Sequence, residues 1–147
     1  MRKNQSSKGG FTLVEIMIVV AIIALLASIA VPAFMRARTR SLASNSLETC
    51  RQVDQAKDQW ALENHKKGTE TPASADLAPY VKQGSKLQKE LTEGAAKDEL
   101  GTAITLNDVD HPPTLDGGSV TEFNKAIPAD KQETFFGAYK AGGTPAP

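Results

Sequence analysis

The stretch that decides the fold is FTLVEIMIVVAIIALLASIAVPAFM, residues 11–35, in which 21 of 25 side chains are apolar. An apolar run of roughly 18 residues or more predicts a transmembrane helix. As a helix this run would be roughly 37 Å long, enough to cross a hydrocarbon core of ~30 Å. Two residues are unusual in such a span: Glu15, which is ionisable, and Pro32, which lacks an amide hydrogen. We therefore expect a membrane helix with a further role.

Two simpler interpretations of the N-terminus stay open. A secretory signal peptide cleaved after Ala30 fits the basic start, the apolar run and the small-residue pattern Ser28-Ile29-Ala30. A plain single-span anchor with an incidental Glu15 fits as well. However, a carboxylate at mid-span costs roughly 2.5–3.5 kcal/mol and by default indicates a function and a partner.

Charge is divided unevenly along the 147 residues. The chain has 17 basic and 17 acidic side chains, but residues 1–40 carry +5 and residues 41–147 carry −5. The zero net charge argues against a nucleic-acid-binding protein, and the length leaves no room for a large multidomain enzyme. The basic end indicates a membrane or assembly role. Cys50 is the only cysteine, which excludes an intramolecular disulfide.

Residues 8–16, KGGFTLVEI, followed by the apolar run, resemble the N-terminus of the type IV pilin superfamily. That superfamily includes pilins and the pseudopilins of type II secretion and competence systems. The resemblance implies a leader over residues 1–10, cleavage after Gly10 by a prepilin peptidase, and N-methylation of the new amine on Phe11. It also implies assembly through the apolar helix into a helical filament.

Glu15 matches the glutamate that this superfamily carries as its fifth mature residue. In apolar surroundings an opposite charge offsets a carboxylate, so we expect Glu15 to attract the N-terminus of a neighbouring subunit and set its register. Pro32 matches a proline at which helices of the superfamily bend or melt locally. Because proline clashes with the preceding turn, we expect a helix break at Pro32, either as a simple kink at the membrane edge or as a flexible point used in packing.

The predicted helix continues beyond the membrane as an amphipathic half over residues 36–67. Apolar residues recur there at steps of three or four, which predicts one buried stripe. The stripe consists of Leu47, Cys50, Val53, Ala56 and Trp60. We expect it to form the platform for the head, with Cys50 as a small core residue. Gly68 is a suitable stop for the helix.

Residues 68–141 predict a small α+β head, and residues 142–147 a flexible tail. Short helices are expected around 76–77 with Ser74 as the N-cap, over 85–92 and over 120–127. Ile104-Thr105-Leu106 predicts the core of a minimal antiparallel sheet. Residues 47–82, which contain Asp76-Leu77-Ala78-Pro79-Tyr80, resemble a type II secretion pseudopilin subgroup in which this stretch packs beside the helix.

Candidate chemistry in the head is sparse. Asp108, Asp110 and Asp116 could suggest calcium, but their spacing does not fit an EF-hand, and solvated loop acids are the better interpretation. His65 and His111 have no convincing partner for catalysis or metal binding. We therefore expect no enzymatic activity, no metal and no cofactor.

The primary hypothesis is a structural subunit of a type II secretion pseudopilus. Its expected partners are a prepilin peptidase and methyltransferase, other copies of itself and related subunits, an inner-membrane assembly platform and membrane lipid. It would cross the bacterial inner membrane once, with the leader cytoplasmic and the head periplasmic, before it enters a pseudopilus or a surface pilus. The alternatives are a type IV pilin for adhesion, motility or DNA uptake, and a secreted or anchored small binding domain.

Overall fold

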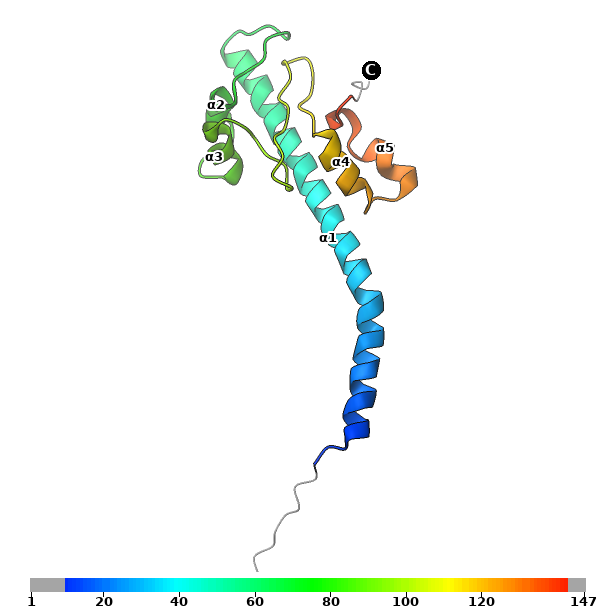
Figure 1. The fold of residues 1–147 in the computed structure, drawn as a ribbon. Coiled ribbons are helices and arrows are strands. Elements are labelled where there is room, and N and C mark those ends of the chain that lie inside the picture. Colours follow the sequence, from blue (N-terminus) through cyan, green and yellow to red (C-terminus); the bar gives the residue numbers. More distant parts are fainter. Residues whose placement is uncertain (1–9, 143–147) are drawn as a thin grey trace, which may run out of the picture. The chain divides into compact units, whose positions relative to one another are not determined.

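The computed structural model describes residues 10–142, and the leader residues before Gly10 and most of the expected tail lie outside this range. The chain divides into an N-terminal unit, Met1–Met35, and a head unit, Arg36–Pro147. The helical elements (Figure 1) are, in chain order, α1 (Leu13–Glu63), α2 (Ser74–Leu77), η1 (Ala78–Tyr80), α3 (Lys86–Glu93), α4 (Gly117–Asn124), η2 (Ala129–Lys131), α5 (Gln132–Phe135) and η3 (Gly137–Tyr139).

The apolar first part of α1 confirms the expected long N-terminal helix. It is long and apolar enough to cross a membrane, and its most apolar window is not buried against any other part of the described chain. The side chains of Phe11, Ile29 and Phe34 are 81%, 70% and 70% exposed. Because a monomer in water rarely exposes so large a continuous apolar surface, this segment requires lipid or other subunits around it.

The head unit is built around one hydrophobic core that includes the predicted stripe of α1. The five stripe residues are at most 8% exposed. They share the core with Leu77 of α2, with Leu87 and Leu91 of α3, and with Phe123 of α4. Figure 1 shows α2 and α3 on one side of the head part of α1, and α4 and α5 on the other. The platform therefore carries short helices on both sides.

The helix α1 ends at Glu63, earlier than the expected stop at Gly68. His65 adopts a left-handed φ of 50°, and the Lys66 amide donates to the Ala61 carbonyl at 2.9 Å. This six-to-one hydrogen bond around a left-handed residue terminates a helix, here with histidine in place of the usual glycine.

Gly68 makes a long-range contact instead. A Cβ atom at this position would overlap the Asp110 carboxylate, and the Asp110 amide donates to the Gly68 carbonyl at 2.8 Å. A side chain at residue 68 would therefore displace the Asp110 carboxylate, which is the flexible end of that side chain.

The short helices begin where polar side chains cap them. The expected helix after Ser85 is confirmed as α3. It begins there because the Ser85 hydroxyl accepts from the Gln88 amide at 3.1 Å. Asp116 caps α4 by accepting from the Gly118 amide at 2.7 Å, so α4 begins at Gly117 rather than at residue 120. Ser74 is the first residue of α2, not its N-cap, and the Asp76 carboxylate accepts from the Ala73 amide at 3.2 Å.

The expected antiparallel sheet is not found in residues 10–142, where pairing is confined to three isolated bridges. The bridge at the predicted strand joins Thr105 to Thr114 through reciprocal hydrogen bonds of 2.9 and 2.8 Å. Between them, Asn107 has a φ of 55°, and Pro112-Pro113 lacks amide donors. The ladder therefore does not extend toward this turn, and on the other side Asp116 already caps α4. The observed head consists of short helices and loops.

Candidate functional site

The predicted cleavage point lies just before the first turn of α1. Gly10 is exposed and non-helical, and the side chain of Phe11 is 81% exposed. A Cβ atom built on Gly10 meets no other atom within 4 Å. Packing within the described chain therefore does not require glycine here, so a requirement for glycine would have to come from an external partner such as a protease groove.

Thr12 and Glu15 form a capping box at the start of α1. The Glu15 amide donates to Thr12 Oγ1 at 3.3 Å, and the Thr12 amide donates to Glu15 Oε2 at 3.3 Å. The Thr12 hydroxyl also lies 3.4 Å from Glu15 Oε2. This reciprocal arrangement satisfies two backbone donors that a helix start otherwise leaves free. This role of Thr12 was not predicted from the sequence, although Thr-x-x-Glu before an apolar run is a recognised signal.

The charged residues at either end of the apolar helix are spaced by one membrane thickness. Between Glu15 and Arg36 lie 20 residues without an ionisable side chain. At 1.5 Å per residue, as in any α-helix, they span roughly 30 Å, which is about the thickness of a hydrocarbon core. If residues 11–35 span a membrane, this spacing allows Glu15 to lie near one interface and Arg36 near the other.

Pro32 lies inside α1, and the helix is assigned without interruption from Leu13 to Glu63. The expected helix break at Pro32 is therefore not present in this structure. Proline still cannot donate a hydrogen bond to the Ser28 carbonyl one turn earlier, so the helix lacks one backbone bond there. A local opening at Pro32 during assembly remains a prediction.

The predicted stripe residue Cys50 is fully buried and forms no disulfide. Burial and, to a smaller extent, the negative charges of Asp98 and Asp54 together raise the pKa of its thiol from the ordinary 9.0 to about 12. The thiolate is the reactive form of cysteine. Cys50 is therefore an inert core residue in the folded chain.

We predict that thiol reagents leave Cys50 unmodified until the head unfolds. The raised pKa also predicts a pH effect: the protonated thiol is favoured in the folded state, so its stabilisation is complete below pH 9.0 and is lost as pH rises toward about 12. Urea titrations at several pH values should show a shallower loss of stability for Cys50→Ala over this window. Rapid labelling of the native protein at neutral pH would contradict the prediction.

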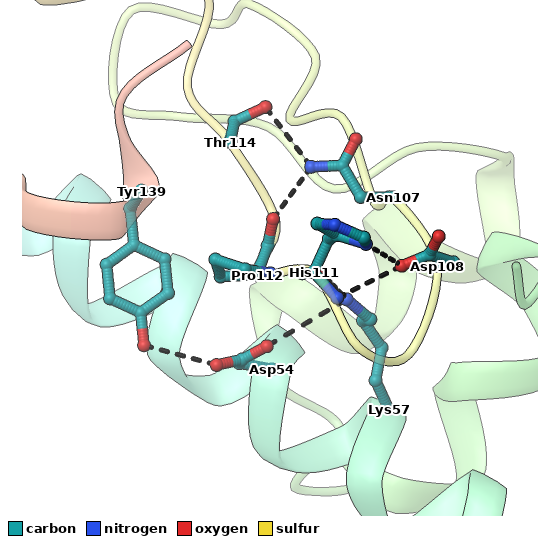
Figure 2. A network of polar contacts seen from close by, with 8 residues as sticks. All are labelled: Asp54, Lys57, Asn107, Asp108, His111, Pro112, Thr114 and Tyr139. Carbon is teal, nitrogen blue, oxygen red and sulfur yellow. Dashed lines mark hydrogen bonds and ion pairs between the residues drawn. The ribbon is translucent and has the colours of Figure 1, made fainter. Parts of the chain in front are cut away.

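A polar network holds the loop 107–114 and Tyr139 against α1 (Figure 2). Its centre is Lys57, which is 0% exposed and donates to the His111 carbonyl at 2.5 Å. The Lys57 ammonium also lies 3.9 Å from Asp54, which accepts from the Tyr139 hydroxyl at 3.2 Å. These contacts join parts of the chain that are 54 and 85 residues apart.

Within the loop 107–114, two further contacts fix the turn that presents the His111 carbonyl. The Asn107 side chain donates to the Pro112 carbonyl at 2.7 Å. The Asp108 carboxylate accepts from the His111 amide at 3.0 Å and also contacts the His111 ring. Hydrogen bonds within residues 107–114 therefore fix the shape of the loop independently of its contact with Lys57.

Burial disfavours the charged forms of Lys57 and Asp54, and the attraction between these two opposite charges partly offsets that effect. Burial lowers the pKa of Lys57, and the Asp54 carboxylate partly opposes this change. Burial likewise raises the pKa of Asp54, against the effect of the Lys57 ammonium. Burial and the charge of Asp54 raise the pKa of Tyr139, which keeps its hydroxyl proton available for donation. The arrangement is suited to fastening the C-terminal part of the head to α1.

The network around Lys57 was not predicted from the sequence. Because lysine is rarely fully buried, the sequence predicts that Lys57 faces solvent on the polar side of the amphipathic helix. One signal was present: Lys57 directly follows Ala56 and lies one turn after Val53, and both of these are stripe residues. Its partners come from distant loops, and no local pattern indicates them.

The loop acids do not converge on a common point. The structure describes no group of three or more His, Cys, Asp or Glu side chains in residues 10–142 that could hold a metal ion. Asp108 contacts His111, Asp110 lies against Gly68, and Asp116 caps α4. The second histidine, His65, serves as the left-handed residue that ends α1.

We predict that calcium and EDTA leave the unfolding temperature of the full chain unchanged. The reason is that each loop acid has a separate local partner and the loop 107–114 is already bound by a cation, the ammonium of Lys57. Thermal unfolding followed by Trp60 fluorescence tests this, with magnesium as the control for ionic strength. A rise of several degrees with calcium alone would show that the loop has a metal site.

Comparison with known proteins adds one finding for the N-terminus. Residues 5–31 match the family model described as the prokaryotic N-terminal methylation motif. No solved structure matches the chain. The match covers the predicted cleavage point, the capping box and most of the apolar run. The chain therefore carries the prepilin-type N-terminal signature of type IV pilins.

Proposed function

We propose that this chain is a non-enzymatic structural subunit of a type II secretion pseudopilus. It is made as a prepilin, cleaved between Gly10 and Phe11, N-methylated on Phe11 and polymerised through the apolar part of α1. One observation carries the proposal: the methylation motif coincides with an apolar helix that has no partner within the described chain. The motif implies processing by a prepilin peptidase and assembly with other pilin-like subunits in general.

Cleavage would change the electrostatics of the N-terminus. It would remove Arg2, Lys3 and Lys8 and leave 14 basic against 17 acidic side chains. It would also create an ammonium on Phe11, which a single methylation leaves positively charged. In the monomer Glu15 accepts from Thr12 through one oxygen, Oε2. A carboxylate has room for several donors, so Glu15 can retain its cap and also accept from the ammonium of a neighbouring subunit.

The assembly step then follows from the change of environment. In the bilayer Glu15 lies near an interface, whereas within a filament the apolar helices of neighbours surround it. An isolated carboxylate is costly there, and a neighbour's ammonium compensates for it only in the correct register. The head would face the periplasm, with an inner-membrane platform extracting subunits from the bilayer.

Two features support a pseudopilin rather than a pilin with a disulfide-closed loop. Cys50 is the only cysteine and lies in the core, so no intramolecular disulfide can close the head. The stretch Asp76–Tyr80 also packs beside the end of α1, where the Tyr80 hydroxyl donates to Glu63 at 3.0 Å and accepts from Asn64 at 3.2 Å.

Deletion of the gene in its own host tests the proposed system. We expect enzymes normally released across the outer membrane to accumulate in the periplasm, while surface motility and DNA uptake stay normal. Complementation with the intact gene should restore export. Normal export combined with lost motility or DNA uptake would identify a type IV pilin instead.

A further inference from the structure

A basic hollow lies at the start of the head unit. It is a shallow, open depression of about 510 Å³, lined by one face of α1 together with a residue that follows α4. The lining residues are Arg36, Ala37, Arg40, Ser41, Ser44 and Ala126. This hollow is separate from the polar network around Lys57 and from the capping box at the start of α1.

Two of the residues that line the hollow are arginines. Arg36 and Arg40 are four residues apart, so they lie on the same face of α1, and both are exposed. The ion pairs described in residues 10–142 involve other cations, which leaves both guanidinium groups without a carboxylate partner there. Guanidinium groups bind phosphate oxygens through paired hydrogen bonds. The hollow therefore has the chemistry of a phosphate site.

The position of the hollow along the chain indicates the source of the phosphate. Arg36 directly follows the apolar segment that ends at Met35, and Arg40 lies one helical turn further, roughly 6 Å along the axis. The headgroup layer on each side of a bilayer is roughly 5–7 Å thick. Both arginines therefore fall in the layer where lipid phosphates lie whenever residues 11–35 span a membrane. An acidic surface of a second copy could also meet them, but only after assembly.

We propose that this hollow binds the headgroup of an anionic phospholipid. Arg36 and Arg40 hold the phosphate, and the site fixes the head on the membrane surface before the subunit is extracted. The inference rests on membrane anchoring through residues 11–35 and does not depend on which filament the subunit joins. Arg38 is exposed on the same stretch of α1 but does not line the hollow, so it provides a matched control of equal charge.

The test uses the full chain in micelles of a neutral detergent, titrated with phosphatidylglycerol and, separately, with phosphatidylcholine. Native mass spectrometry reports the bound lipid. We expect one phosphatidylglycerol to bind in preference to phosphatidylcholine. Arg36→Gln and Arg40→Gln should each weaken its binding about tenfold or more, because each removes charge-assisted hydrogen bonds to the phosphate. Arg38→Gln removes only a charge near anionic lipid and should weaken binding by less than about fivefold, the factor that corresponds to ~1 kcal/mol per basic residue.

Several results would overturn the proposal. Equal losses in all three variants would show general attraction to negative charge rather than a site. Displacement of the lipid by equimolar inorganic phosphate or glycerol phosphate would show a site for free phosphate. A lipid-independent change of oligomeric state in Arg40→Gln, with lipid binding intact, would assign the hollow to a second copy. Co-elution of the chain with the micelles checks anchoring separately, so a failed anchor and a failed site are distinguishable.

Discussion

Glu15→Ala should enter the membrane, be cleaved and be methylated, but it should be absent from filaments. Removing one member of a buried charge pair costs about 3–5 kcal/mol, because the remaining charge is left unpaired. Incorporation should therefore fall by about a hundredfold or more relative to the unmodified chain. Immunoblots of sheared filaments and of membrane fractions measure incorporation and processing in the same cells.

Two matched variants separate the charge of Glu15 from its role in the helix cap. Glu15→Gln keeps a side chain that can complete a capping box but has no charge. Thr12→Ala keeps the charge but removes the cap hydroxyl, at a cost of about 0.5–2 kcal/mol of helix stability. We expect Glu15→Gln to fail in assembly and Thr12→Ala to assemble. The reverse pattern would show that Glu15 acts through the cap alone.

Lys57→Ala should destabilise the head more than any surface substitution. The change leaves the His111 carbonyl without its donor and Asp54 without its cation, and it opens space in the core. Removing one partner of a buried ion pair lowers the free energy of unfolding by about 3–5 kcal/mol. Urea unfolding of the detergent-solubilised chain, followed by the fluorescence of Trp60, the single tryptophan, measures the loss.

Lys57→Met distinguishes charge from volume, because methionine fills most of the space without carrying a charge. It should recover part of the stability but still leave the His111 carbonyl unpaired, at about 1–3 kcal/mol. Lys89→Ala, at an exposed position of α3, is the control and should change stability by less than about 0.5 kcal/mol. If Lys57→Ala behaves like Lys89→Ala, the network around Lys57 does not hold the loop.

The long helix was predictable because its signals are local. A continuous apolar run and a stripe with helical spacing both lie within the sequence of α1 itself, and the Ser85 cap of α3 is equally local. The end of α1 was not predictable in this way, because a left-handed His65 replaces the glycine that usually marks such a stop. The expected sheet was inferred from Ile104-Thr105-Leu106, but this triplet pairs only through the isolated Thr105–Thr114 bridge.

The two candidate sites differ in the same respect. The N-terminal site consists of residues that are close in sequence, so Gly10, Phe11 and Glu15 could be predicted from the sequence alone. The Thr12 cap could also have been predicted, because its signal is local. The network around Lys57 depends on contacts across 54 and 85 residues. Its existence follows only from the way the head closes on α1.

The mature N-terminus provides the most direct measurement of the central claim, that this chain is a processed prepilin. Protein purified from the membranes of its own host should give an N-terminal peptide that begins with N-methylated Phe11, as read by tandem mass spectrometry. A start at Val31 would show an ordinary secretory signal, and an intact Met1 would show a plain anchor. Either of these two results would contradict prepilin processing and the assembly mechanism built on it.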